Sequence, residues 1–98
     1  MAASAARRLE WAPRALQACI DSLARIADED PRTAGLVRER VEHALDLILE
    51  HPRIGVPTAR RGERRYPIPN TGHVIVYRVT LAVLRVHIWY RGRQNVRR

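Results

Sequence analysis

Apolar and polar residues alternate through the last third of the chain, and this pattern constrains the fold more than any other feature. Between Arg64 and Asn95 three runs are typical of short strands, whose successive side chains point to opposite faces. One face would carry the apolar residues Ile68, Ile75, Tyr77, Val79, Leu84, Val86 and Ile88. The other would carry Arg65, Arg78, Arg85, His87 and Trp89. The pattern therefore predicts a small sheet with a core face and an open, cationic face that bears one large aromatic residue.

The upstream residues predict a short strand and two helices that cover the core face. Residues 7–11 alternate as a strand does, and Pro13 is suited to the first turn of a helix. An apolar stripe at helical spacing follows: Leu16, Cys19, Ile20, Leu23, Ile26 and Ala27. Asp30 and Pro31 restart a second helix, which His51-Pro52 stops. Its stripe is Ala34, Val37, Val41, Ala44, Leu45 and Ile48.

The expected order is β-α-α-β-β-β, an α+β domain with a helical hairpin packed on one face of a small antiparallel sheet. Residues 52–63 are expected to be a loop, and Gly72 is expected to supply the positive φ of a hairpin turn. The 98 residues suffice for one domain. We expect a disordered leader at residues 1–6, a single domain at 7–95 and a basic tail at 96–98.

Composition points to an anionic partner without naming it. The net charge is +8, which indicates nucleic acid or an acidic protein as a partner. All 18 basic residues are arginine, so a single arginine carries less functional information than usual. No apolar run approaches the ~20 residues of a membrane span, and we expect no membrane contact. Cys19 is interpreted as a reduced, packed residue of a cytoplasmic protein.

The open-face group has two interpretations. It could be a groove for an acidic partner or a phosphate backbone with Trp89 as an anchor, or an ordinary solvated sheet face; we favour the groove. His87 could act as a general acid or base, but the sequence predicts no carboxylate or nucleophile beside it, which favours a surface histidine. The remaining histidines are scattered and predict no metal site: His43, His51 and His73. No cofactor is predicted.

Five segments, taken in order, resemble one known family. They are LEWAPRA, EDPRTA, LILEHPRIGVP, GERRYPIPNTGHVIVYRV and GRQN. From Arg8 to Asn95 the chain resembles the ParE-like branch of the RelE/ParE toxins of bacterial type II toxin–antitoxin systems. The resemblance implies the β-α-α-β-β-β fold and an antitoxin whose C-terminal segment wraps the toxin. It also implies attack on a housekeeping machine: ParE-like members are associated with DNA gyrase, and RelE-like members with ribosome-dependent mRNA cleavage.

Departures from the nuclease pattern favour the ParE-like branch. The nuclease branch has an arginine early in the third strand, where this chain has Val74. It also has basic residues along the second strand, where Arg65 could serve but the following positions are Tyr66 and Pro67. Its tyrosine several residues after the final basic turn has no counterpart here. Many ParE-like sequences carry a histidine before the last glycine, where this chain has Arg91 before Gly92. The C-terminal tip would then act through charge and shape.

The leading hypothesis is a toxin that binds and poisons DNA gyrase without chemistry of its own. The expected target-binding residues are Trp89, Tyr90, Arg91, Arg93, Gln94 and Asn95. The expected antitoxin-binding surface is the outward side of the helical hairpin and the open face, above all Arg65, Arg78, Arg85 and His87. The alternative is a RelE-like mRNA endonuclease that uses those same four residues in catalysis. A second alternative is a non-toxic interaction module.

Overall fold

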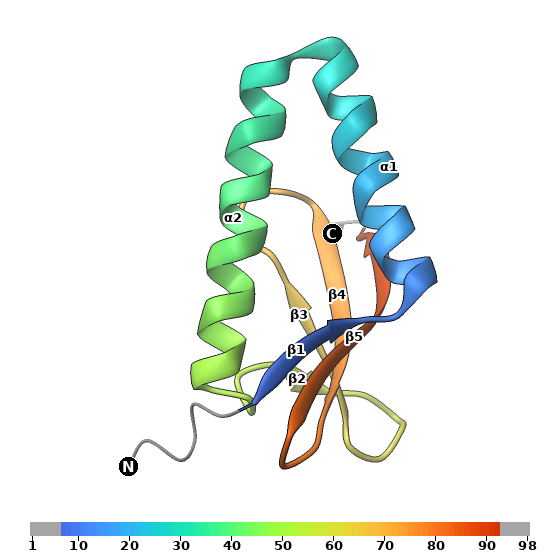
Figure 1. Cartoon of the computed structure of the whole chain (residues 1–98), viewed down its shortest axis with the longest axis vertical. Helices are drawn as coiled ribbons and strands as arrows, with labels where there is room; N and C mark the ends of the chain where they lie inside the picture. Colours follow the sequence, from blue (N-terminus) through green and yellow to red (C-terminus); the bar gives the residue numbers. More distant parts are fainter. Residues whose placement is uncertain (1–6, 93–98) are drawn as a thin grey trace, which may run out of the picture.

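Residues 7–92 are described in the computed structural model, and they form two helices and one five-stranded sheet. The elements are β1 (Arg8–Trp11), α1 (Pro13–Glu29), α2 (Pro31–Glu50), β2 (Val56–Pro57), β3 (Glu63–Pro67), β4 (His73–Val79) and β5 (Val83–Arg91) (Figure 1). The strand order is β1-β5-β4-β3-β2, and only β1 and β5 run parallel. The predicted α+β class, with a helical hairpin on one face of the sheet, is confirmed. The sheet is mixed because β1 runs parallel to β5, and the additional strand β2 lies within residues 52–63, which the sequence predicted to be a loop. The expected leader and tail fall outside the described residues.

Proline and aspartate set the limits of the helical hairpin as the sequence predicts. Pro13 occupies the first turn of α1, where a backbone N–H would have no hydrogen-bond acceptor within the helix. The Asp30 N–H donates to the Ile26 carbonyl oxygen (2.8 Å) and ends α1. The Asp30 carboxylate caps α2 by accepting from the Thr33 hydroxyl (2.7 Å) and the Arg32 N–H (3.1 Å). These hydrogen bonds, first that from Thr33, hold the pKa of Asp30 below its usual value.

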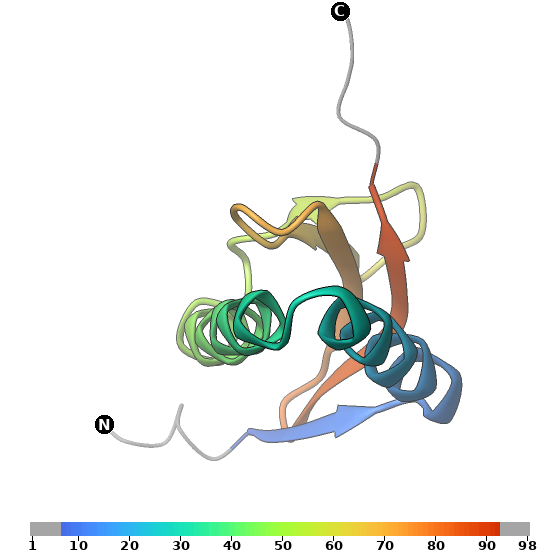
Figure 2. The ribbon, with the colours of Figure 1, turned by 90° about the horizontal axis from the view of Figure 1, so that it is seen from above.

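The hydrophobic core lies between the hairpin and the concave side of the curved sheet (Figure 2). Its largest fully buried side chains are Ile48, Ile75, Tyr77, Leu84 and Val86. Figure 2 shows that both helices lie inside the curve, so neither covers the convex side, which we call the open face. Within residues 7–92 no helix is both long and apolar enough to cross a membrane.

A buried tyrosine ties the segment after α2 to the sheet. The Tyr77 hydroxyl donates to the Pro52 carbonyl oxygen (2.7 Å) and accepts from the Gly55 N–H (3.0 Å). The Arg64 guanidinium donates to the Gly55 carbonyl oxygen (2.7 Å). A Cβ at Gly55 would lie 2.6 Å from the Tyr77 hydroxyl oxygen and 2.9 Å from the Arg65 carbonyl oxygen. Only glycine allows this close approach, which positions β2 against β3.

The two hairpin turns use different chemistry. Between β3 and β4, Asn70 and Gly72 adopt positive φ angles of 60° and 76°, so the predicted role of Gly72 is confirmed. Between β4 and β5 the Thr80 hydroxyl accepts from the N–H groups of Ala82 (3.3 Å) and Val83 (3.0 Å). A threonine side chain thus closes a turn that lacks glycine, asparagine and proline.

A β-bulge in β5 changes which residues face the helices. Two consecutive β4 residues pair with Val86 and Ile88, so His87 is left without a partner. From this point the alternation of β5 is shifted by one residue. Trp89 is 7% exposed and belongs to the core, whereas Ile88 is 44% exposed. The predictions that Ile88 lies in the core and Trp89 on the open face are therefore wrong, because they assumed an unbroken strand.

Candidate functional site

A row of four charged residues crosses the open face from β3 to β1. Glu63, Arg78, Arg85 and Glu10 stand on neighbouring strands in register. An Arg85 guanidinium nitrogen lies 3.1 Å from Glu10 Oε1, and an Arg78 nitrogen lies 3.9 Å from Glu63 Oε2. Arg8 also donates to Glu10 (3.0 Å), and this bond is the largest cause that lowers the pKa of Glu10. The predicted arginines do lie on this face, but carboxylates within the row partly neutralise them.

His87 is held by a buried carboxylate. Its Nε2 lies 2.7 Å from Glu63 Oε2, and the Thr58 hydroxyl donates to Glu63 Oε1 (2.5 Å). Glu63 is 6% exposed, and the hydrogen bond from Thr58, followed by that from His87, lowers its pKa. The expectation that no carboxylate lies beside His87 is wrong. Because Glu63 and Arg65 are two residues apart, an earlier start of the second predicted strand could have placed Glu63 on the open face.

Arg65 differs from the other predicted cations of the open face. It pairs with Val56 of β2 and with Val76 of β4, so it stands between two apolar residues. Its side chain forms no ion pair with any other residue in the range 7–92. Arg65 therefore presents a guanidinium that a partner can still engage.

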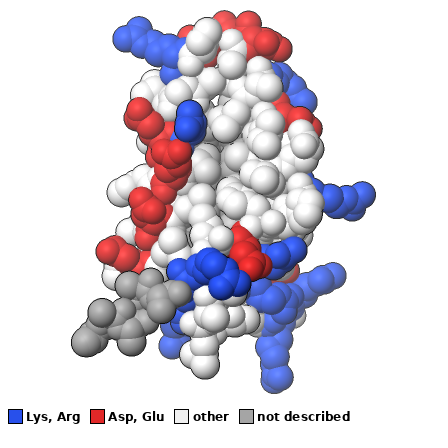
Figure 3. Space-filling model, in the orientation of Figure 1, with Lys and Arg blue, Asp and Glu red and all other residues white. Residues whose placement is uncertain are grey.

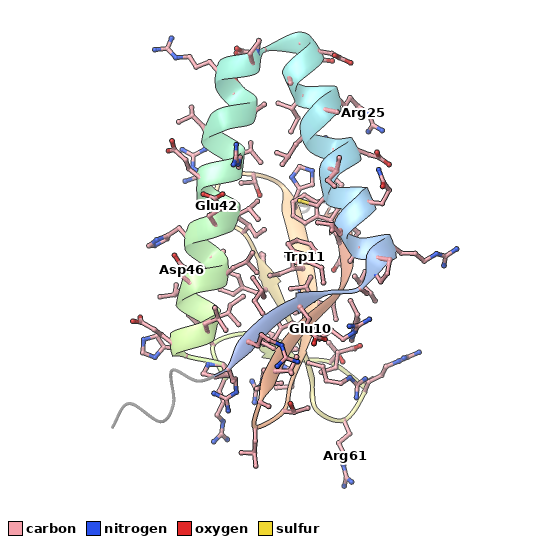
Figure 4. The ribbon with its side chains drawn as sticks, in the orientation of Figure 1. Glu10, Trp11, Arg25, Glu42, Asp46 and Arg61 are labelled. Carbon is pink, nitrogen blue, oxygen red and sulfur yellow. The ribbon has the colours of Figure 1, made fainter. Side chains whose placement is uncertain are left out.

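Trp89 does not lie at the molecular surface as the sequence predicted. Its indole N–H donates to the Ser22 hydroxyl of α1 (3.0 Å), and its ring stacks on His73 with centroids 4.8 Å apart. The Trp11 ring of β1 lies 6.5 Å from it, and Figure 4 labels Trp11 between the two helices. Trp89 thus joins β5 to α1 and is not available as a target anchor.

The exposed end of β5 carries the remaining target-binding candidates. Tyr90 is 41% exposed, and Arg91 is exposed beside it. The Gly92 N–H donates to the Gly72 carbonyl oxygen (2.8 Å), which fixes the end of β5 to the β3–β4 turn. The other three predicted residues, Arg93, Gln94 and Asn95, fall outside the described residues. We call Tyr90 and Arg91 the β5 tip.

Charge is distributed unevenly on the face shown in Figure 3. Blue arginine side chains gather at the end of the molecule near β1, and red acidic side chains follow the outer edge of α2. Glu42 and Asp46 belong to this acidic edge in Figure 4, and Arg25 projects from α1 on the opposite edge. The surface between the two helices is largely uncharged. The hairpin therefore offers a partner an uncharged strip with an acidic border along α2.

The buried thiol of Cys19, on the helix side of the sheet, has a structural role. Cys19 is 5% exposed, and burial raises the pKa of its thiol to about 11, so it packs as predicted and does not ionise near neutral pH. Among residues 7–92 no three His, Cys, Asp or Glu side chains converge on a possible metal position.

Comparison with protein families decides the classification. Residues 9–95 match the model of the ParE toxin of the type II toxin–antitoxin system parDE. The chain belongs to the ParE toxin family. It is a toxin of a type II toxin–antitoxin system within the RelE/ParE superfamily, as the sequence resemblance predicted. Toxins of this kind are paired with an antitoxin, so an antitoxin partner is expected on the same grounds.

Individual relatives agree with this classification. The toxin is 29% identical over 86 residues to the protein named "Putative toxin Y4kP" of Sinorhizobium fredii, an alignment that covers 83% of this chain and 90% of the relative. The fold of this chain is similar to that of the isolated E. coli RelE toxin, with a TM-score of 0.68 and 21% identity over 92% of this chain and 88% of that one. A mutant of E. coli RelE in complex with an antitoxin RelBc peptide gives a TM-score of 0.63 and 22% identity, covering 91% and 86% of the two chains.

Proposed function

We propose that this toxin inhibits growth by binding DNA gyrase and trapping it on cleaved DNA, and that a cognate antitoxin prevents this. The observation that carries the proposal is the match of nearly the whole chain to the ParE toxin model, since ParE-like members are associated with gyrase. Binding without chemistry needs only a complementary surface. The β5 tip supplies one with an exposed aromatic ring and an exposed cation, two residue types that are enriched at interface hot spots.

The charges of the open face also fit this proposal. RNA recognition relies on cations that neutralise several phosphates. Here Arg78 and His87 already face the Glu63 carboxylate, at 3.9 and 2.7 Å. Arg85 faces the Glu10 carboxylate at 3.1 Å. A polyanion would have to compete with these internal partners. At the β5 tip, no carboxylate of residues 7–92 forms an ion pair with Arg91.

One observation favours a second candidate, a ribosome-dependent mRNA endonuclease. A histidine held at 2.7 Å by a buried carboxylate can transfer protons, and a nearby guanidinium can stabilise developing phosphoryl charge. In that reaction His87 would exchange a proton with the RNA, Arg65, Arg78 and Arg85 would hold phosphate, and Glu63 would orient the imidazole. The nuclease alternative therefore involves Arg65, Arg78, Arg85 and His87, whereas gyrase binding involves the β5 tip.

Induction of the full chain in a bacterial host without antitoxin separates the two. Gyrase poisoning predicts DNA breaks and an SOS response while translation continues at first. Rapid translation arrest with cleaved messages would overturn the proposal in favour of the nuclease. Absence of any growth defect, with the protein present and folded, would leave only a non-toxic interaction module.

Four variants locate the activity. Removal of Arg91 to Arg98, or the single change Arg91→Glu, should abolish or weaken toxicity while antitoxin binding persists. His87→Ala should remain toxic if gyrase is the target and should lose toxicity if RNA is cleaved. Arg61→Glu, which makes the same charge change at an exposed loop arginine at the far end of the molecule (Figure 4), is the matched control and should stay toxic.

A further inference from the structure

The open face has a charged half and an apolar half. The charged half is the row formed by Glu63, Arg78, Arg85 and Glu10. Beyond the bulge, strand register and alternation place mostly apolar side chains on the open face around Arg65, and Glu63 of the charged half lies two residues before it on β3. We call the apolar residues the open-face apolar patch: Val56, Pro67, Val74, Val76, Ile88 and Tyr90.

Four members of the patch are exposed: Val56, Pro67, Ile88 and Tyr90. The exposed fractions are 50% for Val56, 44% for Ile88 and 41% for Tyr90. Val74 and Val76 are buried but do not belong to the core cluster beneath the helices, as expected for residues on the opposite face. Exposed apolar surface of this kind, ringed by polar groups, marks interaction sites on soluble proteins.

A hollow of about 550 Å³ adjoins the patch. Its walls include Arg65, Pro67, Val74, Tyr90 and the turn at residues 68–73. This volume is large enough to receive an anchoring side chain of a partner. Arg65 lies both in the wall of the hollow and between two apolar patch residues, so one occupant can fill the hollow and meet the guanidinium.

The chemistry of the patch specifies a segment of protein that combines apolar side chains with a carboxylate. Arg65 is exposed and forms no ion pair within residues 7–92, so its guanidinium is available to a carboxylate of a partner. Single-stranded RNA fits less well, since its successive phosphates need several free cations and the surrounding side chains are mostly aliphatic. A second copy of this chain fits less well too, because two chains of net charge +8 repel each other.

We propose that the antitoxin binds the open-face apolar patch through a segment with apolar side chains and an Asp or Glu that pairs with Arg65. This proposal rests on the function proposed above, in which an antitoxin neutralises the toxin. Of the predicted antitoxin surface, which comprised the outward side of the hairpin and Arg65, Arg78, Arg85 and His87, it retains Arg65. It adds apolar residues, among them Ile88, which the sequence had assigned to the core, and Val56, which it had assigned to a loop. Because Tyr90 belongs to both the patch and the β5 tip, an occupant of the patch also covers the base of the tip. The bound antitoxin then neutralises the toxin by blocking access of the target to the β5 tip.

A random-peptide phage library selected on the full chain, made by cell-free synthesis, tests the surface. Enriched peptides should combine apolar residues with Asp or Glu. Their binding should fall by about tenfold or more on Arg65→Glu and on Ile88→Asp, as expected when a charged hydrogen bond or a buried apolar contact is lost. Arg61→Glu and Leu81→Asp are matched controls, because Leu81 is 93% exposed in the β4–β5 turn, and both should bind as the parent does. Reselection on Arg65→Glu should enrich Lys or Arg.

The antitoxin itself provides the second readout. The enriched motif should recur in the cognate antitoxin, and purified antitoxin should bind Arg65→Glu more weakly than Arg61→Glu. Equal binding of both variants would overturn the patch proposal even if the toxin acts on gyrase. A lack of growth inhibition by the parent chain would overturn the proposed function while the peptide selection still reports on the patch. Patch-dependent binding of a single-stranded oligonucleotide, or Ile88-dependent dimerisation, would also overturn the patch proposal.

Discussion

Glu63 and His87 meet on the open face although their strands are not neighbours, with Oε2 and Nε2 only 2.7 Å apart. The bulge at His87 frees this residue from the pairing of β4 with β5. One backbone irregularity therefore accounts for three features. It brings His87 to a carboxylate, turns Ile88 outward and turns Trp89 into the core.

The buried carboxylate should contribute measurably to stability. In Glu63→Gln the amide cannot satisfy Thr58, His87 and Arg78 as the carboxylate does. The free energy of unfolding should fall by about 1–3 kcal/mol, the usual effect of a buried polar group that loses a partner. Urea unfolding at neutral pH measures this change. Glu50→Gln, whose side chain is 76% exposed, is the control and should change it by less than about 0.5 kcal/mol.

Stability should fall as the pH is lowered through the range in which unfolded histidine titrates. Burial, and then the charge of Arg91, lowers the pKa of His73 below its ordinary value of 6.5. Above pH 6.5 the ring is neutral in both states, and its contribution to stability is fully present. Below pH 6.5 the unfolded chain takes up a proton that the folded protein resists. Stability is therefore lost until the pH reaches the folded pKa.

His73→Phe isolates this effect. The variant keeps an aromatic ring against Trp89 and removes the titrating group, whose Nδ1 is buried without a hydrogen-bond partner among the described residues. Denaturant midpoints measured between about pH 8 and pH 5 should decline less steeply in the variant than in the parent. Parallel declines would show that other groups cause the loss.

Two glycines should respond in opposite ways to alanine. Gly35 lies within α2, and a Cβ there would meet no atom within 4 Å, so Gly35→Ala should stabilise the protein by about 0.5–1 kcal/mol. Gly55→Ala would push a methyl group against Tyr77 and the Arg65 carbonyl oxygen. It should lower the melting temperature, whereas Gly35→Ala should raise it. A rise in both would contradict the close approach at Gly55.

Removal of the Tyr77 hydroxyl should release the segment after α2. Tyr77→Phe leaves the Gly55 N–H and the Pro52 carbonyl oxygen without their shared partner, at an expected cost of about 1–3 kcal/mol. Tyr90→Phe removes the same hydroxyl from a side chain that is 41% exposed, and should cost less than about 0.5 kcal/mol. Amide hydrogen exchange should show faster exchange at Gly55 in the first variant only.

Much of the fold could be predicted because its signals are local. Pro13, Asp30 and Pro31 define the helix limits, and the apolar stripe places Cys19 in the core. The site was less predictable. No residue type marks the bulge at His87, and every assignment beyond it in β5 depends on that bulge.

The sequence alone also could not show which carboxylates lie beside the arginines and the histidine of the open face. Glu63 lies 24 positions from His87, and Glu10 lies 75 positions from Arg85. Only the pairing of strands brings these residues together. Alternation correctly placed the arginines on one face, but it could not show which of them already have a carboxylate partner and which, like Arg65, have none within residues 7–92.

Gyrase poisoning is tested most directly by incubating the purified full chain with purified DNA gyrase, supercoiled plasmid and ATP and then denaturing the protein. Linear plasmid should accumulate with the parent chain and with Arg61→Glu, and much less with Arg91→Glu. Unchanged gyrase cleavage at equimolar toxin, together with message cleavage on translating ribosomes that His87→Ala abolishes, would contradict gyrase poisoning.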